Sequence, residues 1–236
     1  MNCLAFLEKE IHSVIMATVD DRGLPVTCAV DIMDSDNNGL YFLTAKGKSF
    51  YHRLVKQGYV ALTGMKGGDT MSCVAVSVRG KVEEIGNERL DRLLDKNPYM
   101  LEIYPNEQSR EALTVFRLYE GEGEWFDLSK KPIERFSFSI GNKEVPATGY
   151  VITENCNGCK KCSTVCPQNC IDFEKTPAVI IQEHCLHCGN CFFVCPQKAI
   201  IPKTVVFIIN VLVHLEILQY NIFAHMSQFP DCHLFL

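Results

Sequence analysis

Nine of the thirteen cysteines in this 236-residue chain lie between positions 156 and 195. Eight of them form two runs of the pattern C-x-x-C-x-x-C-x-x-x-C-P, and the second run repeats the first after a shift from position 156 to position 185. Three cysteines at this spacing wrap one loop around a shared centre, and the proline after the fourth forces the chain out of the loop. The cysteines are Cys156, Cys159, Cys162 and Cys166 in the first run, and Cys185, Cys188, Cys191 and Cys195 in the second.

The centre that suits this spacing is an iron–sulfur cluster. A [4Fe–4S] cubane needs four thiolates, so a loop that supplies three of them takes the fourth from elsewhere. The two runs resemble those of bacterial-type ferredoxins with two clusters, in which the last cysteine of each run ligates the other cluster. The resemblance implies one [4Fe–4S] cluster on Cys156, Cys159, Cys162 and Cys195, and a second on Cys185, Cys188, Cys191 and Cys166.

Zinc is the alternative occupant, because four thiolates also make a tetrahedral zinc site. Zinc ribbons separate their cysteine pairs by a longer loop and do not close on Cys-Pro, so we favour iron–sulfur. Cys170 stands where the second half of the repeat has Ala199. We interpret Cys170 as a small buried residue rather than a ninth ligand, since a free cysteine packs like an apolar side chain. Ile171 and Ile200 are expected to pack over the clusters.

The composition indicates in which cellular compartment the protein is expected and which kinds of partner it does not favour. A net charge of −5 and a pI near 5.8 argue against an electrostatic nucleic-acid binder. The first ten residues do not read as a secretory signal. Metal binding then explains the many cysteines better than disulfides do, and we expect a cytoplasmic protein.

Residues 1–140 read as an antiparallel β-domain with flanking helices. Short turns rich in Gly, Asp and Asn separate strand-like segments, and this density of strands and turns predicts a meander that closes as a barrel or sandwich. Helices are predicted around Leu4 to Ile11, at 50–57 and at 88–96, where Pro98 ends the last of them. Strands are predicted at 14–19, 24–33, 40–44, 59–65, 71–84, 113–119, 124–128 and 134–140, with turns at 20–23 and 34–39 and a hairpin turn over Gly121-Glu122-Gly123.

The stretch 44–49 is a candidate phosphate-binding loop between a predicted strand and a predicted helix. A phosphate ester is a dianion, which is bound by a fixed cation, hydroxyl donors and the free backbone N–H groups of a helix start. A solvated basic turn is the alternative. The candidate cofactor-binding residues are Thr44, Ala45, Lys46, Lys48 and Ser49.

Residues 14–140 resemble the FMN-binding split-barrel proteins, the superfamily of pyridoxamine 5′-phosphate oxidase. The resemblance lies in the order of the elements and in three stretches: ATVD…GLP at 17–25, GLYFLTAKGKS at 39–49 and VRGKVE at 78–83. It implies an FMN whose phosphate binds the 44–49 loop, with backbone near 27–31 facing the isoalloxazine, and a homodimer around the flavin. The expected fold class is α+β: an antiparallel split β-barrel with flanking helices, plus a small C-terminal ferredoxin-type two-cluster domain.

Departures from the family bear on the substrate. True pyridoxamine phosphate oxidases end in a segment whose Arg and His residues grip the substrate, and here the cysteine runs stand in its place. We therefore do not expect a true pyridoxamine phosphate oxidase. Related barrels bind deazaflavin, haem or nothing identified; we interpret His12 and His52 as solvated or core-edge residues rather than haem ligands, and Trp125 as a core residue rather than a flavin-stacking one. No dinucleotide-binding fingerprint is present, so we expect no dedicated NAD domain.

The predicted domain order is a split-barrel domain at 1–140, a linker at 141–149, a two-cluster ferredoxin domain at 150–203 and an apolar tail at 204–236. The tail approaches bilayer length but contains Glu216 near its centre, which is costly in a membrane helix. We therefore do not expect a membrane anchor, and a helix that docks on the barrel or on a dimer partner is the preferred interpretation. A poorly ordered tail, or an altered reading frame, is the alternative.

Together these features predict a flavin and iron–sulfur redox protein, an oxidoreductase of unknown substrate that passes electrons between FMN and two [4Fe–4S] clusters. Its partner would be a redox protein or a small-molecule acceptor. Two alternatives stay open: an electron carrier or docking module without its own substrate, and a redox sensor.

Overall fold

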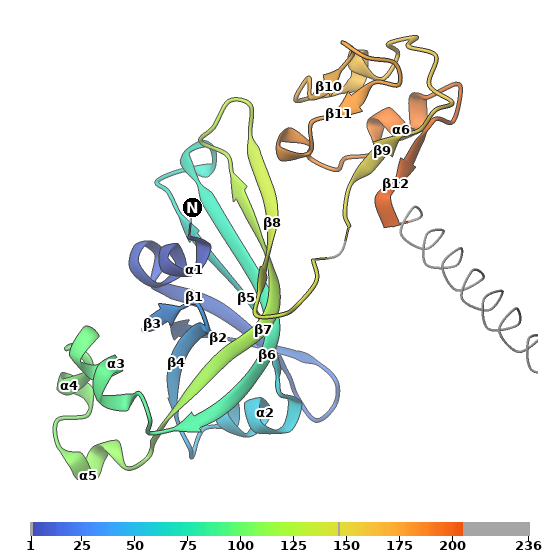
Figure 1. Ribbon diagram of the computed structural model, residues 1–236. Helices are drawn as coiled ribbons and strands as arrows, with labels where there is room; N and C mark the ends of the chain where they lie inside the picture. Colours follow the sequence, from blue (N-terminus) through green and yellow to red (C-terminus); the bar gives the residue numbers. More distant parts are fainter. Residues whose placement is uncertain (1, 146, 205–236) are drawn as a thin grey trace, which may run out of the picture. The chain divides into compact units, whose positions relative to one another are not determined.

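The computed structural model describes residues 2–145 and 147–204 (Figure 1). The chain divides into two compact units between residues 145 and 146. The tail expected at 204–236 lies outside the described residues, apart from Thr204. Within the two described ranges, no helix has the length and hydropathy needed to cross a membrane.

The first unit is one antiparallel sheet with short helices around it. Its strands lie in the order β2-β1-β5-β6-β7-β4-β3, and β8 also pairs with β7. Strand β2 contacts β4, so the sheet curls around a shared core, and the predicted α+β fold with an antiparallel barrel is confirmed. The strands are β1 (Ser13–Val19), β2 (Pro25–Asp31), β3 (Asp34–Asp36), β4 (Gly39–Ala45), β5 (Tyr59–Lys66), β6 (Val74–Gly86), β7 (Leu113–Asp127) and β8 (Glu134–Ile140). The helices are α1 (Cys3–Phe6), the π-helical turn η1 (Leu7–Ile11), α2 (Ser49–Gln57), the 3₁₀ turn η2 (Thr70–Ser72), α3 (Leu90–Lys96), α4 (Met100–Ile103) and α5 (Glu107–Arg110).

The hairpin predicted over residues 121–123 is wrong, because β7 runs through them without a turn. It pairs with β6 along its length, with β4 over its first half and with β8 over its second. The glycines instead allow close contact with the neighbouring strands, with backbone at Gly121 and with a side chain at Gly123. A Cβ on Gly121 would lie 2.4 Å from the carbonyl oxygen of Arg79, and a Cβ on Gly123 would lie 2.3 Å from the Phe138 ring.

Strand β4 is buried on both faces, because successive side chains point to opposite sides of a sheet. Phe42 faces the barrel interior and stacks on Phe116 with ring centroids 5.8 Å apart. Tyr41 faces a second core, formed with α3 and α4. Trp125 is buried in the barrel interior beside Phe136, in agreement with its interpretation as a core residue.

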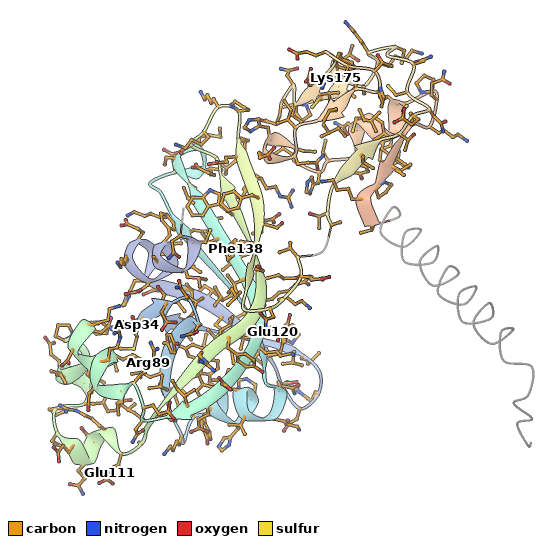
Figure 2. All side chains as sticks on the ribbon, viewed as in Figure 1. Asp34, Arg89, Glu111, Glu120, Phe138 and Lys175 are labelled. Atoms are coloured by element: carbon orange, nitrogen blue, oxygen red, sulfur yellow. The ribbon has the colours of Figure 1, made fainter. Side chains whose placement is uncertain are left out.

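An ion-pair network attaches α3 to the barrel. The Asp34 side chain is fully buried on β3, in a segment whose sequence predicts a turn, and Arg92 Nε donates to its Oδ2 at 2.6 Å. Lys96 joins Asp34 to the buried Glu8. Arg89 lies beside Asp34 (Figure 2), and its guanidinium carbon is 4.0 Å from the centroid of the Tyr41 ring. Burial alone would raise the pKa of Asp34, but hydrogen bonds from Arg92 and Lys96 hold it below its ordinary value.

The second unit consists of two β-ribbons joined by the cysteine loops. Strand β9 (Tyr150–Ile152) pairs with β12 (Ile200–Pro202), and β10 (Ile171–Asp172) pairs with β11 (Val179–Ile180), both antiparallel. Its core holds one isoleucine from each strand together with several of the cysteines. Short helical segments complete the unit: η3 (Ser163–Val165), η4 (Gln182–His184) and α6 (Asn190–Val194).

Replacing Asp34 with Asn should destabilise the first unit by about 2 kcal/mol at neutral pH, because the fully buried side chain loses the charge that accepts hydrogen bonds from the partly exposed Arg92 and Lys96. Urea unfolding followed through Trp125, the single tryptophan, measures this. The difference from wild type should shrink as the pH falls below 3.8, the ordinary aspartate pKa, since the wild-type carboxyl then also becomes protonated. The control is Asp21→Asn, which disrupts an exposed pair with Lys56 and should change little. A difference that stays constant with pH would contradict the role given to the Asp34 charge.

Candidate functional site

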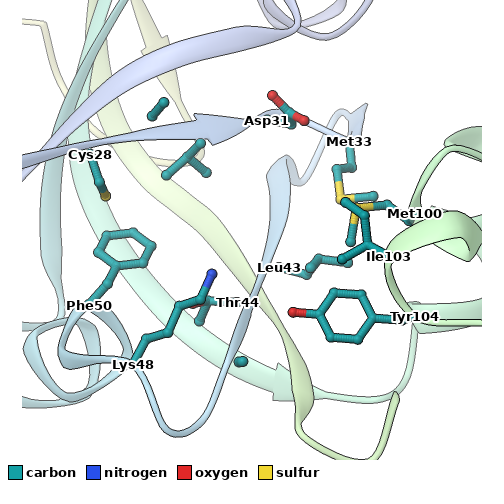
Figure 3. A pocket seen from close by; sticks show the side chains of 13 residues that line it. Cys28, Asp31, Met33, Leu43, Thr44, Lys48, Phe50, Met100, Ile103 and Tyr104 are labelled. Atoms are coloured by element: carbon teal, nitrogen blue, oxygen red, sulfur yellow. The ribbon is translucent and has the colours of Figure 1, made fainter. Parts of the chain in front are cut away.

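A cavity of about 280 Å³ opens beside the barrel, between β2, the end of β4 and α4 (Figure 3). Strand β2 contributes four consecutive residues, and the end of β4 with the loop after it contributes Thr44 and Lys48. Both Met33, beyond β2, and Leu43 on β4 add apolar surface. The lining residues are Cys28, Ala29, Val30, Asp31, Met33, Leu43, Thr44, Ala45, Lys48, Phe50, Met100, Ile103 and Tyr104.

The structure separates the five predicted phosphate-loop residues into two groups. Thr44, Ala45 and Lys48 line the cavity, and Figure 3 shows the Lys48 side chain extending from its loop toward the middle of the cavity. Lys46 and Ser49 are not among the lining residues. The Lys46 backbone N–H instead donates to the Ala112 carbonyl at 2.8 Å, and Ser49 is the first residue of α2.

The Thr44 hydroxyl gives the cavity an unused polar group. Thr44 is 3% exposed, and its Oγ1 has no hydrogen-bond partner among the residues that the structure describes. A buried hydroxyl without a partner costs free energy unless a ligand or water satisfies it. A cation, an unsatisfied hydroxyl and the start of a helix are the groups that a phosphate ester needs, so these residues fit a flavin phosphate.

The apolar wall formed by α4 was missed by sequence reasoning. Met100 and Ile103, with Tyr104 just beyond them, face the cavity from a four-residue helix. Pro98 correctly predicted the end of the preceding helix, but so short a helix has no periodicity to detect. Strand β2, by contrast, lies where the family resemblance placed the backbone facing the isoalloxazine.

A chain of hydrogen bonds connects Asp31 in the cavity lining to His12, the residue that follows η1. The Tyr99 hydroxyl donates to Asp31 at 2.7 Å, and His12 Nε2 is 3.0 Å from the same hydroxyl. Burial and the Asp31 charge raise the pKa of Tyr99 above its ordinary value, so it stays protonated at neutral pH. His12 therefore belongs to a structural network at the edge of the core.

Two small cavities in the second unit divide the repeat cysteines between them. The first cavity is lined by Cys156, Cys159, Cys162 and Cys195. The second cavity is lined by Cys166, Cys185, Cys188 and Cys191, together with Cys170. Each set combines three cysteines of one run with the last cysteine of the other. The isoleucines expected beside the clusters follow the same division, with Ile200 at the first cavity and Ile171 at the second.

The backbone of the two runs repeats as closely as the sequence does. Gly158 and Lys160 have φ angles of 71° and 60°, and the equivalent His187 and Gly189 have 55° and 79°. Left-handed backbone at the same two places gives both runs the same tight loop, with glycine at only one of the two places in each.

The thiols of the second cavity differ in their ease of ionisation. Burial, with a smaller contribution from Cys185, raises the pKa of Cys191 to about 11. Burial also opposes ionisation of Cys166, but backbone N–H groups of residues 168–170 and the Cys170 thiol lower its pKa below the ordinary value. Among the described residues, no three potential ligands lie close enough together to hold a single metal ion. In a [4Fe–4S] cluster four thiolates share a cube of four irons rather than one ion.

Comparison with known proteins matches both units. The sequence model of pyridoxamine 5′-phosphate oxidase matches residues 2–125, and that of the 4Fe–4S dicluster domain matches residues 155–199. No curated protein matches the chain.

Several solved structures are similar to the chain. A NimC/NimA family protein from Clostridium acetobutylicum is 19% identical, with a TM-score of 0.49 over 58% of this chain and 90% of that one. A protein related to general stress protein 26 of B. subtilis, also from C. acetobutylicum, is 17% identical, with a TM-score of 0.45 over 58% and 91%. A pyridoxamine 5′-phosphate oxidase-related, FMN-binding protein from Nostoc punctiforme is 12% identical, with a TM-score of 0.40 over 59% and 90%.

The two family matches account for different parts of the chain and agree with the two units of the structure. Because the first match covers more than half of the 236 residues, the chain belongs to the pyridoxamine 5′-phosphate oxidase family, with a 4Fe–4S dicluster domain joined to its C-terminal side.

Proposed function

We propose that this chain is a flavin and iron–sulfur redox protein that passes electrons between an FMN in the barrel cavity and two [4Fe–4S] clusters in the second unit. The observation that carries the proposal is the division of eight cysteines between two cavities, four in each, within one chain that also carries a flavin-type cavity. A flavin exchanges one or two electrons and each cluster exchanges one, so the pair can split a two-electron reaction into single-electron steps.

The residues have distinct parts in this proposal. Lys48 and the Thr44 hydroxyl hold the FMN phosphate, and the β2 backbone from Cys28 to Asp31 lies along the flavin ring. The apolar side chains of α4 and Met33 shield the ring from water. The cavity sets support the crossed cluster ligands: Cys156, Cys159, Cys162 and Cys195 for one, and Cys185, Cys188, Cys191 and Cys166 for the other.

The electrons enter or leave through a redox partner protein or a small-molecule acceptor, and the protein is a cytoplasmic homodimer through its barrel. An electron carrier without a substrate of its own is the alternative. Turnover of a small acceptor that requires the bound flavin favours the oxidoreductase. Reduction and reoxidation by a partner protein alone, with no small acceptor turned over, favours the carrier.

Anaerobic purification followed by cofactor analysis tests the proposal directly. We expect a brown protein with about eight irons per chain and one FMN, because two cubanes hold four irons each. Zinc in place of iron would exclude the clusters. Iron without flavin, even after incubation with FMN, would exclude the flavoprotein.

Lys48→Ala should weaken FMN binding about 10- to 100-fold, since a hydrogen bond to a charged group contributes about 1.5–3 kcal/mol. The matched control is Lys46→Ala, which removes the same charge from the same loop without altering the cavity lining. Fluorescence titration of the flavin-free protein with FMN measures both affinities. Equal losses for the two variants would favour a diffuse basic turn over a specific phosphate site.

Cys195→Ala should remove the cluster of the first run rather than that of its own run. Iron content should fall to about four per chain. Adding Cys159→Ala should then cause no further loss, because both residues line the first cavity, whereas adding Cys188→Ala should remove the remaining iron. The reverse pattern in the two double variants would overturn the crossed assignment.

A further inference from the structure

The two cysteine cavities differ at one equivalent position. Cys170 follows the first run at the place that Ala199 occupies after the second. Both residues are buried, at 3% and 1% exposure, and each lines one cavity. The second cavity therefore has five thiols around it, while the first has four.

The additional thiol contacts a proposed cluster ligand. Cys170 Sγ lies 3.5 Å from Cys166 Sγ, within hydrogen-bonding distance for two sulfur atoms. Cys185, another proposed ligand of the same cluster, lines the same cavity and belongs to the same core as Cys170. Because the Cys170 side chain is buried, its surroundings hold its thiol in contact with the Cys166 sulfur.

Cys170 and Ala199 also have similar backbone surroundings. The Ala199 N–H donates to Cys195 Sγ at 3.3 Å, and the Cys170 N–H is among the backbone groups that favour the thiolate form of Cys166. Backbone N–H groups thus act on the last cysteine of both runs. Cys166 also receives a contact from the Cys170 thiol. Cys195 has no such contact from Ala199, because alanine has no sulfur atom.

We propose that Cys170 is a tuning residue of the second cluster: its thiol donates a hydrogen bond to the ligand Cys166 and makes that cluster easier to reduce than it would be with alanine at this position. The inference rests on the proposed function, since it requires the clusters. Cys166 as a ligating thiolate has no proton to give, so Cys170 is the donor. A reduced cluster carries one more negative charge than an oxidised one, so a donor to its ligand sulfur stabilises the reduced form more and raises the potential.

Three variants of the full chain, purified anaerobically, test this role through the midpoint potentials of the clusters. Cys170→Ala should shift one midpoint to more negative potential and leave the iron content unchanged. Cys170→Ser keeps a donor and should shift that midpoint less. Ala199→Cys places a thiol at the first site and should shift the other midpoint to more positive potential. Redox titration followed by electron paramagnetic resonance measures these shifts.

The outcomes separate the tuning role from the proposed function. Unchanged midpoints in Cys170→Ala, or equal shifts of both, with about eight irons retained, would overturn the tuning role alone. Loss of half the iron from Cys170→Ala would also overturn it, because Cys170 would then be a ligand. A wild-type protein without iron–sulfur clusters would instead overturn the proposed function.

Discussion

The close contact between β6 and β7 at Gly80 and Gly121 is the constraint on which the barrel depends. A Cβ on Gly80 would lie 2.5 Å from the Glu120 carbonyl oxygen and 2.9 Å from the Gly121 Cα, so neither position accommodates a side chain in this arrangement. The register between the two strands shifts just beyond this point, between Lys81 and Val82. Such irregularities increase local twist and allow long strands to bend. Strand β7 can therefore pair with β4 in its first half and with β8 in its second. It thus connects β4, which borders the cavity, to β8 in one sheet.

The same contact explains where sequence reasoning failed. Glycines in a strand-like segment suggest a turn as readily as a close approach of two backbones, and only the partner strand distinguishes the two. Strand β3 was assigned to a turn for a related reason, because Asp34 is polar and its burial depends on Arg92 and Lys96, far along the chain. The strands with plain alternation and the helices with clear apolar faces were predicted well, since their pattern is local.

The candidate sites show the same contrast between local and distant information. Thr44 and Lys48 were identified because a phosphate loop is local in sequence, but the direction of Lys46 depends on the bond of its backbone to Ala112. The α4 wall could not be predicted, because it approaches the cavity only through the packing of Met100 against the second core. The cysteine spacing, in contrast, fixes two tight loops by itself, and the repeated left-handed backbone shows how closely the second loop copies the first.

The division of cysteines between the two cavities has a consequence for how such a unit can be divided or shortened. Each 29-residue half repeats the other in sequence, from position 156 to position 185, and by its sequence each half carries a full set of four cysteines. Neither half can line a complete cavity, however, because each contributes its last cysteine to the other. A chain cut between β10 and β11 would leave two fragments, each with three cysteines around an incomplete centre and a fourth directed elsewhere. The repeat is thus a unit of sequence but not of structure, because the first site needs residues from 156 to 195 and the second needs residues from both runs, from 166 to 191.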